Sequence, residues 1–355
     1  MDFGIAVPSA ADSWKIVARA EALGFTHAWF YDTQMLCADP FVAMAAAAMH
    51  TTRIRLGTGV LVPSNRIAPV TAAAFASLNA LAPGRIDFGV GTGFTARRAM
   101  GFGAMTLKAT ETYVNQVMAL LAGETVDFTM EGETHPIRFL NPELGLINTA
   151  DPVALHVSAY GPRARALTAR LGAGWLNFIG VPRSGAAELA AMQAAWAAAG
   201  RSAPLQATAF ALGCILEPGE AFDSPRALAE AGPRAAVLLH RAADEALAGL
   251  PNSSKVPEAV AAEVAGYVAL ARDFTPPEAR YMANHRGHLL FVKPEERPFV
   301  TAELIRQTTF TGTAAELRAR IGDLRDAGYT QFAIQILPDH PETLEGWGRI
   351  RAAFA

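Results

Sequence analysis

The chain has few of the residues that define several classes of protein. Its 355 residues include two cysteines, Cys37 and Cys214, which is too few for a disulfide framework and fits a reducing compartment. The formal net charge of −3 leaves no basic excess, which argues against a nucleic-acid partner. The first ten residues lack the basic and apolar regions of a signal peptide, and the apolar run 43–48 is too short to cross a bilayer. We therefore expect a cytoplasmic protein with neither a membrane nor a nucleic-acid partner.

Several catalytic and binding motifs are also missing. No G-x-G-x-x-G opens the first predicted helix, and there is no G-x-S-x-G elbow and no P-loop. The stretch Asn284-His-Arg-Gly-His288 holds two histidines, but their spacing does not place them one helical turn apart as paired ligands. Because no cysteine or carboxylate pair stands beside them, we expect no metal site.

Short apolar segments alternate regularly with amphipathic ones. Hydrophobic residues make up 51% of the chain, enough for a large core. Eight apolar segments of strand length, most of them followed by a helical pattern, lie at 3–7, 27–31, 54–60, 86–91, 153–158, 175–178, 205–216 and 331–337. This rhythm favours an α/β fold of the (β/α)8 TIM-barrel type over a doubly wound sheet. We expect one domain over 1–355, with an insertion at about 217–309 after the seventh strand and a hairpin excursion at 124–148.

In such a barrel, ligands bind at the carboxyl ends of the strands. The third strand, within "RIRLGTGVLVP" (53–63), carries Gly57 and Gly59, which predict a bulge or a close approach of another group. The fifth strand ends in Ser158-Ala-Tyr-Gly-Pro162, where a proline-initiated helix offers free N–H groups to a phosphate or simply begins a helix. The turn 89–93, followed by Arg97 and Arg98, is either an anion site or a tight turn with solvated arginines.

Four further side chains are weighed for chemistry. Asp32 ends the second strand, where a carboxylate either orients a neighbour or caps the following turn. Cys37 has no base beside it in sequence, so we expect it to be inert. His285 and His288 would move a proton if the insertion folds over the barrel mouth, and would otherwise lie in a polar loop.

Four ordered stretches resemble the bacterial luciferase-like oxidoreductases, which use a flavin or coenzyme F420. The resemblance is strongest to the subgroup labelled methylenetetrahydromethanopterin reductase-like. It omits 124–148 and 217–309, and its stretches lie at 21–32, 39–93, 156–177 and 310–335.

The resemblance implies a non-prolyl cis peptide at Gly59–Val60, behind the central ring of the cofactor. It also implies an acidic residue at Asp32 and a homodimer. The cofactor-binding residues carried over are Thr58, Gly59, Val60, Gly91, Thr92, Ser158, Ala159, Tyr160, Gly161, Pro162 and Asn177. Where related dehydrogenases carry a histidine and a glutamate, this chain has Thr33 and Phe94. The catalytic candidates are therefore His288 and His285, together with Asp32.

Three functions are compatible with this resemblance. The first is a two-component monooxygenase that acts on a small organic substrate, with reduced FMN supplied by a partner flavin reductase. The second is an F420-dependent reductase or dehydrogenase, whose cofactor has a long acidic tail and needs a basic exit groove; Arg97, Arg98 and Arg163 suit either cofactor. The third is a flavin-binding protein without turnover. The sequence analysis favours the first.

Overall fold

Eight parallel strands close into a barrel in the computed structural model, which describes residues 1–179, 185–249 and 256–354. They are hydrogen-bonded in the order β1-β12-β9-β8-β7-β4-β3-β2. Their bounds are β1 Asp2–Val7, β2 His27–Phe30, β3 Arg55–Thr58, β4 Ile86–Val90, β7 Ala154–Ser158, β8 Gly174–Phe178, β9 Ala207–Ala211 and β12 Gln331–Gln335. The closed order confirms the predicted TIM barrel and excludes the doubly wound sheet.

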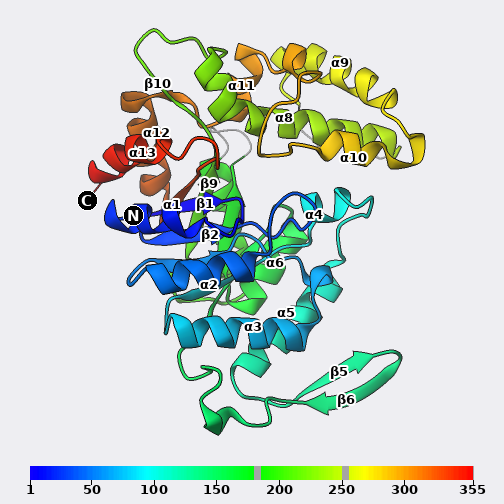
Figure 1. The fold of residues 1–355 in the computed structure, drawn as a ribbon, viewed down its shortest axis with the longest axis vertical. Helices are drawn as coiled ribbons and strands as arrows, with labels where there is room; N and C mark the ends of the chain where they lie inside the picture. The colour runs from blue at the N-terminus through cyan, green and yellow to red at the C-terminus, as the bar shows by residue number, and fades with distance from the viewer. Residues whose placement is uncertain (180–184, 250–255, 355) are drawn as a thin grey trace.

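A layer of helices surrounds the barrel and buries the outer faces of the strands (Figure 1). Side-chain caps begin two of these helices: Asp39 Oδ1 accepts from Phe41 N–H at 2.8 Å, and Thr313 forms a capping box with Glu316. The helices are α1 Trp14–Ala22, α2 Pro40–His50, α3 Ala68–Leu81, α5 Leu107–Leu121, α6 Pro162–Leu171, α7 Gly185–Ala198, α12 Ala314–Ala327 and α13 Thr343–Ala352. A short helix that the sequence analysis missed, α4 (Phe94–Arg98), follows β4.

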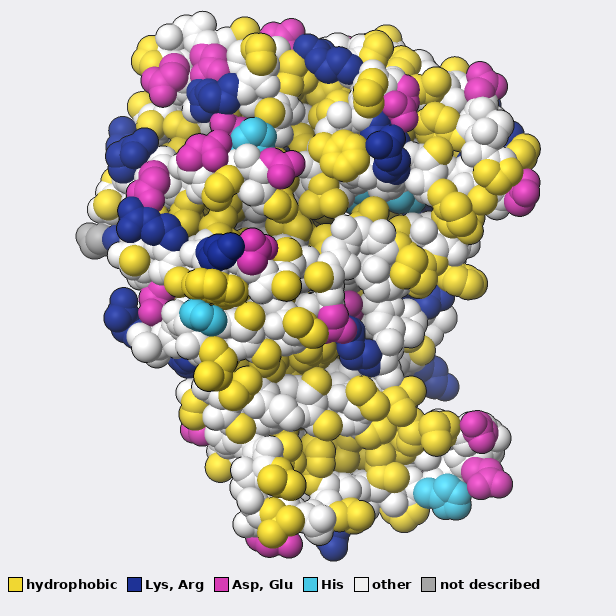
Figure 2. Space-filling model, in the orientation of Figure 1, with side chains coloured by type: hydrophobic (Ala, Val, Ile, Leu, Met, Phe, Trp, Pro, Cys, Tyr) yellow, Lys and Arg dark blue, Asp and Glu magenta, His cyan; other side chains and the backbone are white. Residues whose placement is uncertain are grey.

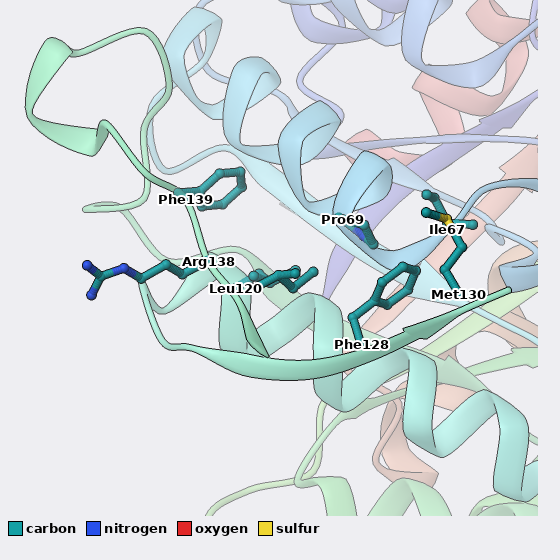
Figure 3. A pocket seen from close by; sticks show the side chains of 8 residues that line it. Ile67, Pro69, Leu120, Phe128, Met130, Arg138 and Phe139 are labelled. Carbon is teal, nitrogen blue, oxygen red and sulfur yellow. The ribbon is translucent and has the colours of Figure 1, made fainter. Parts of the chain in front are cut away.

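The excursion at 124–148 contains the predicted hairpin, whose strands are β5 (Val126–Met130) and β6 (Glu133–Ile137). The hairpin extends away from the barrel (Figure 1). Its apolar side chains, among them Phe128 and Met130, line a groove against Ile67 and Leu120 (Figure 3). Apolar side chains gather where the hairpin meets the body of the molecule (Figure 2). None of the predicted site residues lines this groove.

The insertion after β9 forms a second lobe, on the side of the barrel opposite the hairpin (Figure 1). Its elements are β10 Ile215–Leu216, α8 Pro225–Leu247, α9 Ala261–Arg272, α10 Arg280–His285 and α11 Ala302–Thr308. It has its own hydrophobic core, in which Leu239, Tyr267 and Leu304 are fully buried. Strand β11 (Gly312–Thr313) pairs with β10 and returns the chain to the barrel.

The helices of residues 1–179, 185–249 and 256–354 include none that is both long and apolar enough to cross a membrane.

Candidate active site

The floor of the barrel mouth is aromatic. Trp29, Phe178 and Phe210 project inward from β2, β8 and β9, with ring centroids 5.6 Å apart for Trp29–Phe210 and 4.6 Å apart for Phe178–Phe210. Trp29 is fully buried, and its Nε1–H donates to Oε1 of Gln331 at 2.9 Å. Because both the ring and its polar tip are held, Trp29 is a rigid base for anything bound above it.

Trp29 also explains the two glycines of the third strand. A Cβ on Gly57 would lie 2.7 Å from ring carbons of Trp29, and one on Gly59 would lie 2.8 Å from the Cβ of Trp29. The close approach predicted from the sequence is therefore to a side chain of this chain. The Gly59–Val60 peptide bond is cis, as the family resemblance implied. Val60 is half-buried and lies against Gly91, where an added Cβ would be 2.8 Å from Val60 Cγ2.

Thr58 and Asn177 were both predicted to contact a cofactor, but their side chains do not point into the mouth. Thr58 is fully buried, and its Oγ1 donates to the carbonyl oxygen of Gly89 at 2.7 Å. Asn177 Nδ2 donates to Glu188 at 2.7 Å and to the hydroxyl of Tyr329 at 2.8 Å. Side chains alternate between the two faces of a strand, and both residues occupy positions that face the surrounding helices rather than the barrel interior. Their side chains point away from the mouth, although Oδ1 of Asn177 lacks a partner among the described residues, and contact of either residue with a cofactor stays a prediction.

Asp32 supports the bulge after β3. One carboxylate oxygen accepts from Val62 N–H at 2.9 Å, and the other lies 3.3 Å from Nη1 of Arg66. The side chain is buried, and Arg66 also pairs with Asp39. Because both oxygens have protein partners, we interpret Asp32 as a positioning residue rather than the catalytic group considered above.

The turn at 89–93, after β4, was considered as an anion site together with Arg97 and Arg98, and the structure does not bring both arginines to it. Gly91 N–H donates to the carbonyl oxygen of Leu61 at 3.1 Å, and Thr92 is half-buried. Arg97 Nε donates to the carbonyl oxygen of Gly103, and Arg98 pairs with Asp244 of the insertion at 3.0 Å. Arg98 is therefore neutralised by a carboxylate, whereas the printed partner of Arg97 is a carbonyl oxygen, which leaves its charge in place.

The connection from β7 to α6 keeps the features that a phosphate needs. Gly161 is the N-cap of α6 and Pro162 follows it; no side chain caps this end, and a Cβ on Gly161 would meet nothing within 4 Å. Ser158 is half-buried, and Ala159 is buried with its carbonyl oxygen bonded to Trp175. Free N–H groups at a helix N-terminus favour an anion.

Tyr160 stands directly before the first turn of α6, and its side chain is 53% exposed. Desolvation raises the pKa of its hydroxyl to about 12, and Arg234 of the insertion acts on the same hydroxyl. The predicted stretch 158–162 therefore lies within electrostatic reach of the insertion.

The insertion is docked on the mouth through contacts with three parts of the barrel. Gln335 Nε2, at the end of β12, donates to the carbonyl oxygen of Leu289 at 2.8 Å. Arg234 of α8 donates to the carbonyl oxygen of Ile179, after β8, at 3.2 Å. The pair Arg98–Asp244 joins α4 to α8. Leu289 also packs on the aromatic floor, so the segment containing His285 and His288 lies over the barrel, as one reading of the sequence required.

His288 ends a chain of buried hydrogen bonds within the insertion. Its Nδ1 lies 2.8 Å from Nδ1 of His240, and His240 Nε2 lies 2.5 Å from Oε1 of Glu296. Glu296 also accepts from Nζ of Lys293 at 2.8 Å and from the hydroxyl of Tyr267 at 3.1 Å. Burial alone would raise the pKa of Glu296, but the hydrogen bonds from His240 and Lys293 lower it, so the carboxylate is ionised.

The carboxylate fixes the proton positions along this chain. His240 Nε2 must carry a hydrogen toward Glu296, and burial lowers the pKa of His240, so its Nδ1 is an acceptor. His288 Nδ1 is then the donor between the two rings. Burial, followed by the repulsion of His240, lowers the pKa of His288 well below its ordinary value. His288 is therefore neutral with a lone pair on Nε2, whose neighbour, Thr95 Oγ1, lies at the long distance of 3.5 Å.

His285 has different surroundings. Its Nε2 lies 3.1 Å from Asp244, the residue that also binds Arg98. Burial alone would raise the pKa of Asp244, but the hydrogen bonds from His285 and Arg98 lower it. This arrangement anchors the insertion to α4, so we interpret His288 as the reactive histidine and His285 as a support. His240 and Glu296 were not predicted, since they come from distant segments and no local motif marks them.

Besides Nδ1 of His285 in the insertion and Oδ1 of Asn177, two buried polar atoms of the barrel strands' carboxyl ends lack partners among the described residues. They are the hydroxyl of Tyr31, after β2, and Oε1 of Gln335. Tyr31 is 6% exposed and Gln335 is 5% exposed. Buried polar groups without partners are uncommon, and each calls for an explanation. Strand alternation from Trp29 would have placed Tyr31 at the mouth.

The residues at the mouth include groups that fit a flavin-type cofactor. Trp29, Phe178 and Phe210 form a rigid aromatic floor, and Val60 of the β3 bulge packs against it. The unpartnered atoms of Tyr31 and Gln335 supply polar contacts, and the uncapped start of α6 suits a phosphate.

The thiol of Cys37 is not activated as a nucleophile by its surroundings. Burial raises the pKa of its thiol to about 11, so the thiol stays protonated at neutral pH. This agrees with the expectation from the sequence.

Comparisons with known proteins agree with this geometry. The sequence model of the family described as luciferase-like monooxygenase matches residues 4–331. A 5,10-methylenetetrahydromethanopterin reductase from Methanolobus tindarius is 28% identical over 341 residues, covering 94% of this chain and 93% of that protein. An F420-dependent glucose-6-phosphate dehydrogenase from Beutenbergia cavernae is 38% identical over 141 residues, covering 38% and 40%.

Solved structures share the fold. An F420-dependent secondary alcohol dehydrogenase in complex with an F420-acetone adduct aligns with 100% of this chain and 99% of its own, at a TM-score of 0.68 and 16% identity. A monooxygenase from Streptomyces bottropensis aligns with 100% of each chain, at a TM-score of 0.60 and 19% identity. With a family model that spans most of the sequence and a closed eight-stranded barrel, the chain belongs to the luciferase-like monooxygenase family.

Proposed function

We propose that this protein transfers a hydride between coenzyme F420 and a small organic substrate that carries a hydroxyl or carbonyl group. The observation that carries the proposal is His288, a neutral buried histidine that lies over the barrel mouth, and whose Nε2 lone pair has one printed neighbour among the described residues, Thr95 Oγ1 at the long distance of 3.5 Å. Removal of a hydride from a carbinol carbon releases the hydroxyl proton, and a neutral histidine is the side chain best suited to accept it.

The choice of F420 rests on relatives that resemble this chain in sequence. The methylenetetrahydromethanopterin reductase matches over almost the full length, and the glucose-6-phosphate dehydrogenase is named as F420-dependent. Their printed activities are hydride transfers rather than oxygenations. This differs from the function that the sequence analysis favoured.

The residues of the mouth have separate tasks in this reaction. Bound F420 supplies the hydride acceptor or donor. Trp29 and the β3 bulge support its ring, and the first turn of α6 holds its phosphate. Leu289 and the rest of the docked insertion exclude water.

The buried chain behind His288 sets its protonation. His288 takes the substrate proton on Nε2, while its Nδ1–H remains bonded to His240. The ionised Glu296 behind His240 holds the tautomer and favours the protonated form once it arises, as a carboxylate does behind a catalytic histidine. In the reverse direction, protonated His288 returns the proton to the carbonyl oxygen.

A second candidate is the FMN-dependent monooxygenase, with a partner reductase. One observation favours it: Arg97 and Arg98, which were considered for the long acidic tail of F420, are engaged with Gly103 and Asp244. Of the arginines considered for that tail, Arg163 alone is left exposed at the start of α6. FMN ends at a single phosphate and needs no such groove.

The two candidates separate under anaerobic conditions. Protein loaded with F420 should reduce the cofactor when a suitable secondary alcohol is added without oxygen, and this is followed by loss of the F420 absorbance. A substrate conversion that requires both reduced FMN and oxygen, with no F420 reduction, would replace the proposal with the second candidate. Cofactor binding without either turnover would support the non-catalytic alternative.

A further inference from the structure

Arg234 is a cation at the mouth without a carboxylate partner among the described residues. It lies on α8, is half-buried, and donates to the carbonyl oxygen of Ile179. Two other arginines near the mouth differ: Arg98 pairs with Asp244 at 3.0 Å, and Arg241 pairs with Glu245 at 3.2 Å. Residues 180–184 and 250–255 contain no Asp or Glu in the sequence. The charge of Arg234 is therefore not balanced by an acidic side chain of this chain.

Arg234 reaches across the mouth. Ile179 follows β8 and Tyr31 follows β2, and these strands are four apart in either direction around the barrel. Arg234 is bonded to Ile179 and lies within electrostatic reach of the Tyr31 and Tyr160 hydroxyls. It is also within reach of His288. Arg234 is therefore bonded at the β8 side of the mouth and acts electrostatically on the Tyr31 hydroxyl, which follows β2.

The environment of this charge is unfavourable without a ligand. Burial lowers the pKa of Arg234, although guanidinium groups stay protonated in proteins. A cation held from water with no anion destabilises the fold. The Tyr31 hydroxyl, buried and unpartnered, adds a hydrogen-bond donor in the same space. A planar guanidinium and a neighbouring hydroxyl can both donate hydrogen bonds to the oxygens of a carboxylate.

We propose that Arg234 and the Tyr31 hydroxyl bind a carboxylate of the substrate, so that the substrate is a small hydroxy or oxo acid rather than a neutral alcohol or ketone. The inference rests on the proposed function in placing the reacting carbon near His288. An acidic group of the cofactor has the same chemistry, and the experiment separates the two sources.

The experiment measures binding rather than turnover. Melting temperatures are recorded at constant ionic strength, with and without F420, in the presence of acetate, butyrate, lactate or 3-hydroxybutyrate, and of the corresponding neutral amides. We expect at least one carboxylate to raise the melting temperature by about 2–5 °C at saturation, with no shift from its amide. Equal shifts from acid and amide, or no shift from any acid, would overturn the proposal.

Two variants assign the effect to Arg234. Arg234→Gln should abolish the carboxylate shift and keep F420 affinity within about threefold, whereas Arg241→Gln, which removes a paired arginine, should keep the shift. If Arg234→Gln instead weakens F420 binding more than tenfold, the anion belongs to the cofactor and the substrate assignment is wrong. If Arg234→Gln does not fold, Arg234→Lys replaces it. Lysine keeps the charge without the planar fork, so the carboxylate shift should become smaller, and an unchanged shift would overturn the assignment to Arg234.

The result is independent of the reaction. A carboxylate shift that is lost in Arg234→Gln, in a protein that reduces no F420, would leave the anion site standing and remove the proposed function.

Discussion

The two ends of the barrel interior differ in whether their buried polar groups have hydrogen-bond partners. At the base, Asp87 accepts from Nε and Nη2 of Arg55 at 3.0 and 2.6 Å, and Gln331 accepts from Trp29 at 2.9 Å. Nδ1 of His156 is the exception there. At the mouth, the Tyr31 hydroxyl and Gln335 Oε1 lack partners among the described residues.

This difference separates stability from function. Buried polar groups that satisfy one another hold strands together, and removing one partner exposes the other to a desolvation cost. Buried polar groups without partners contribute nothing to the fold and persist where a ligand supplies the missing bonds. The mouth is therefore the part of the barrel built for binding, and substitutions at the two ends should have different consequences.

The largest effect is expected at the mouth, on turnover. His288→Asn removes the proton acceptor while its amide can still donate to His240 Nδ1, so kcat/KM should fall by about 10²–10⁴-fold with little change in melting temperature. His285→Asn, which alters the support at Asp244, is the matched control and should lose less than about tenfold. Equal losses in both variants would contradict the assignment of His288.

At the base, the corresponding change should affect stability. Asp87→Asn leaves the guanidinium of Arg55 without its carboxylate, and since Arg55 is about one-third exposed we expect a loss of about 2–3 kcal/mol in the free energy of unfolding. Urea denaturation measures this directly. Cofactor affinity should be unchanged, and a variant that loses affinity while keeping its stability would break the comparison.

Acidification should destabilise both ends. Burial lowers the pKa of His27, at the base, to about 4, and it lowers that of His288, at the mouth. Below the unfolded value of about 6.5 the unfolded chain binds protons that the folded chain does not, so stability is lost as the pH falls. Each group adds a slope approaching about 1.4 kcal/mol per pH unit. Urea unfolding between pH 7.5 and 5 should show this fall. His27→Asn and His288→Asn should each reduce the slope; an unchanged slope in both would be inconsistent with these pKa shifts.

The smallest effect is expected for Cys37→Ser. Because the pKa of the thiol is raised to about 11, it has no nucleophilic role to lose, and turnover should stay within about twofold of the unmodified protein. A loss of activity beyond tenfold would show that the thiol takes part in the reaction.

The barrel could be predicted because its determinants are local. Alternating apolar segments, caps such as Asp39 and glycine stops place each strand and helix within a few residues of the structure. The cis peptide at Gly59–Val60 came from the family resemblance. The family resemblance did not explain why residues 57 and 59 are glycines. The cause is the side chain of Trp29, which is a neighbour across the sheet and not along the chain.

The chemistry of the mouth depends on contacts between distant segments. His240, His288 and Glu296 are brought together by the packing of α8 against the loops after α10. Arg98 lies in a stretch with the composition of an anion site, yet its carboxylate partner Asp244, from a distant segment, neutralises it. The sequence shows which charged and polar side chains are present, but tertiary packing determines which of them lack partners within the protein.

The central claim is that the mouth binds F420 for hydride transfer, and titration of the apoprotein tests it most directly. Fluorescence is followed as F420 or FMN is added to the unmodified protein and to Asp87→Asn. We predict saturable F420 binding that is at least tenfold tighter than FMN binding and the same in both proteins. Tight FMN binding with no F420 binding would contradict the account.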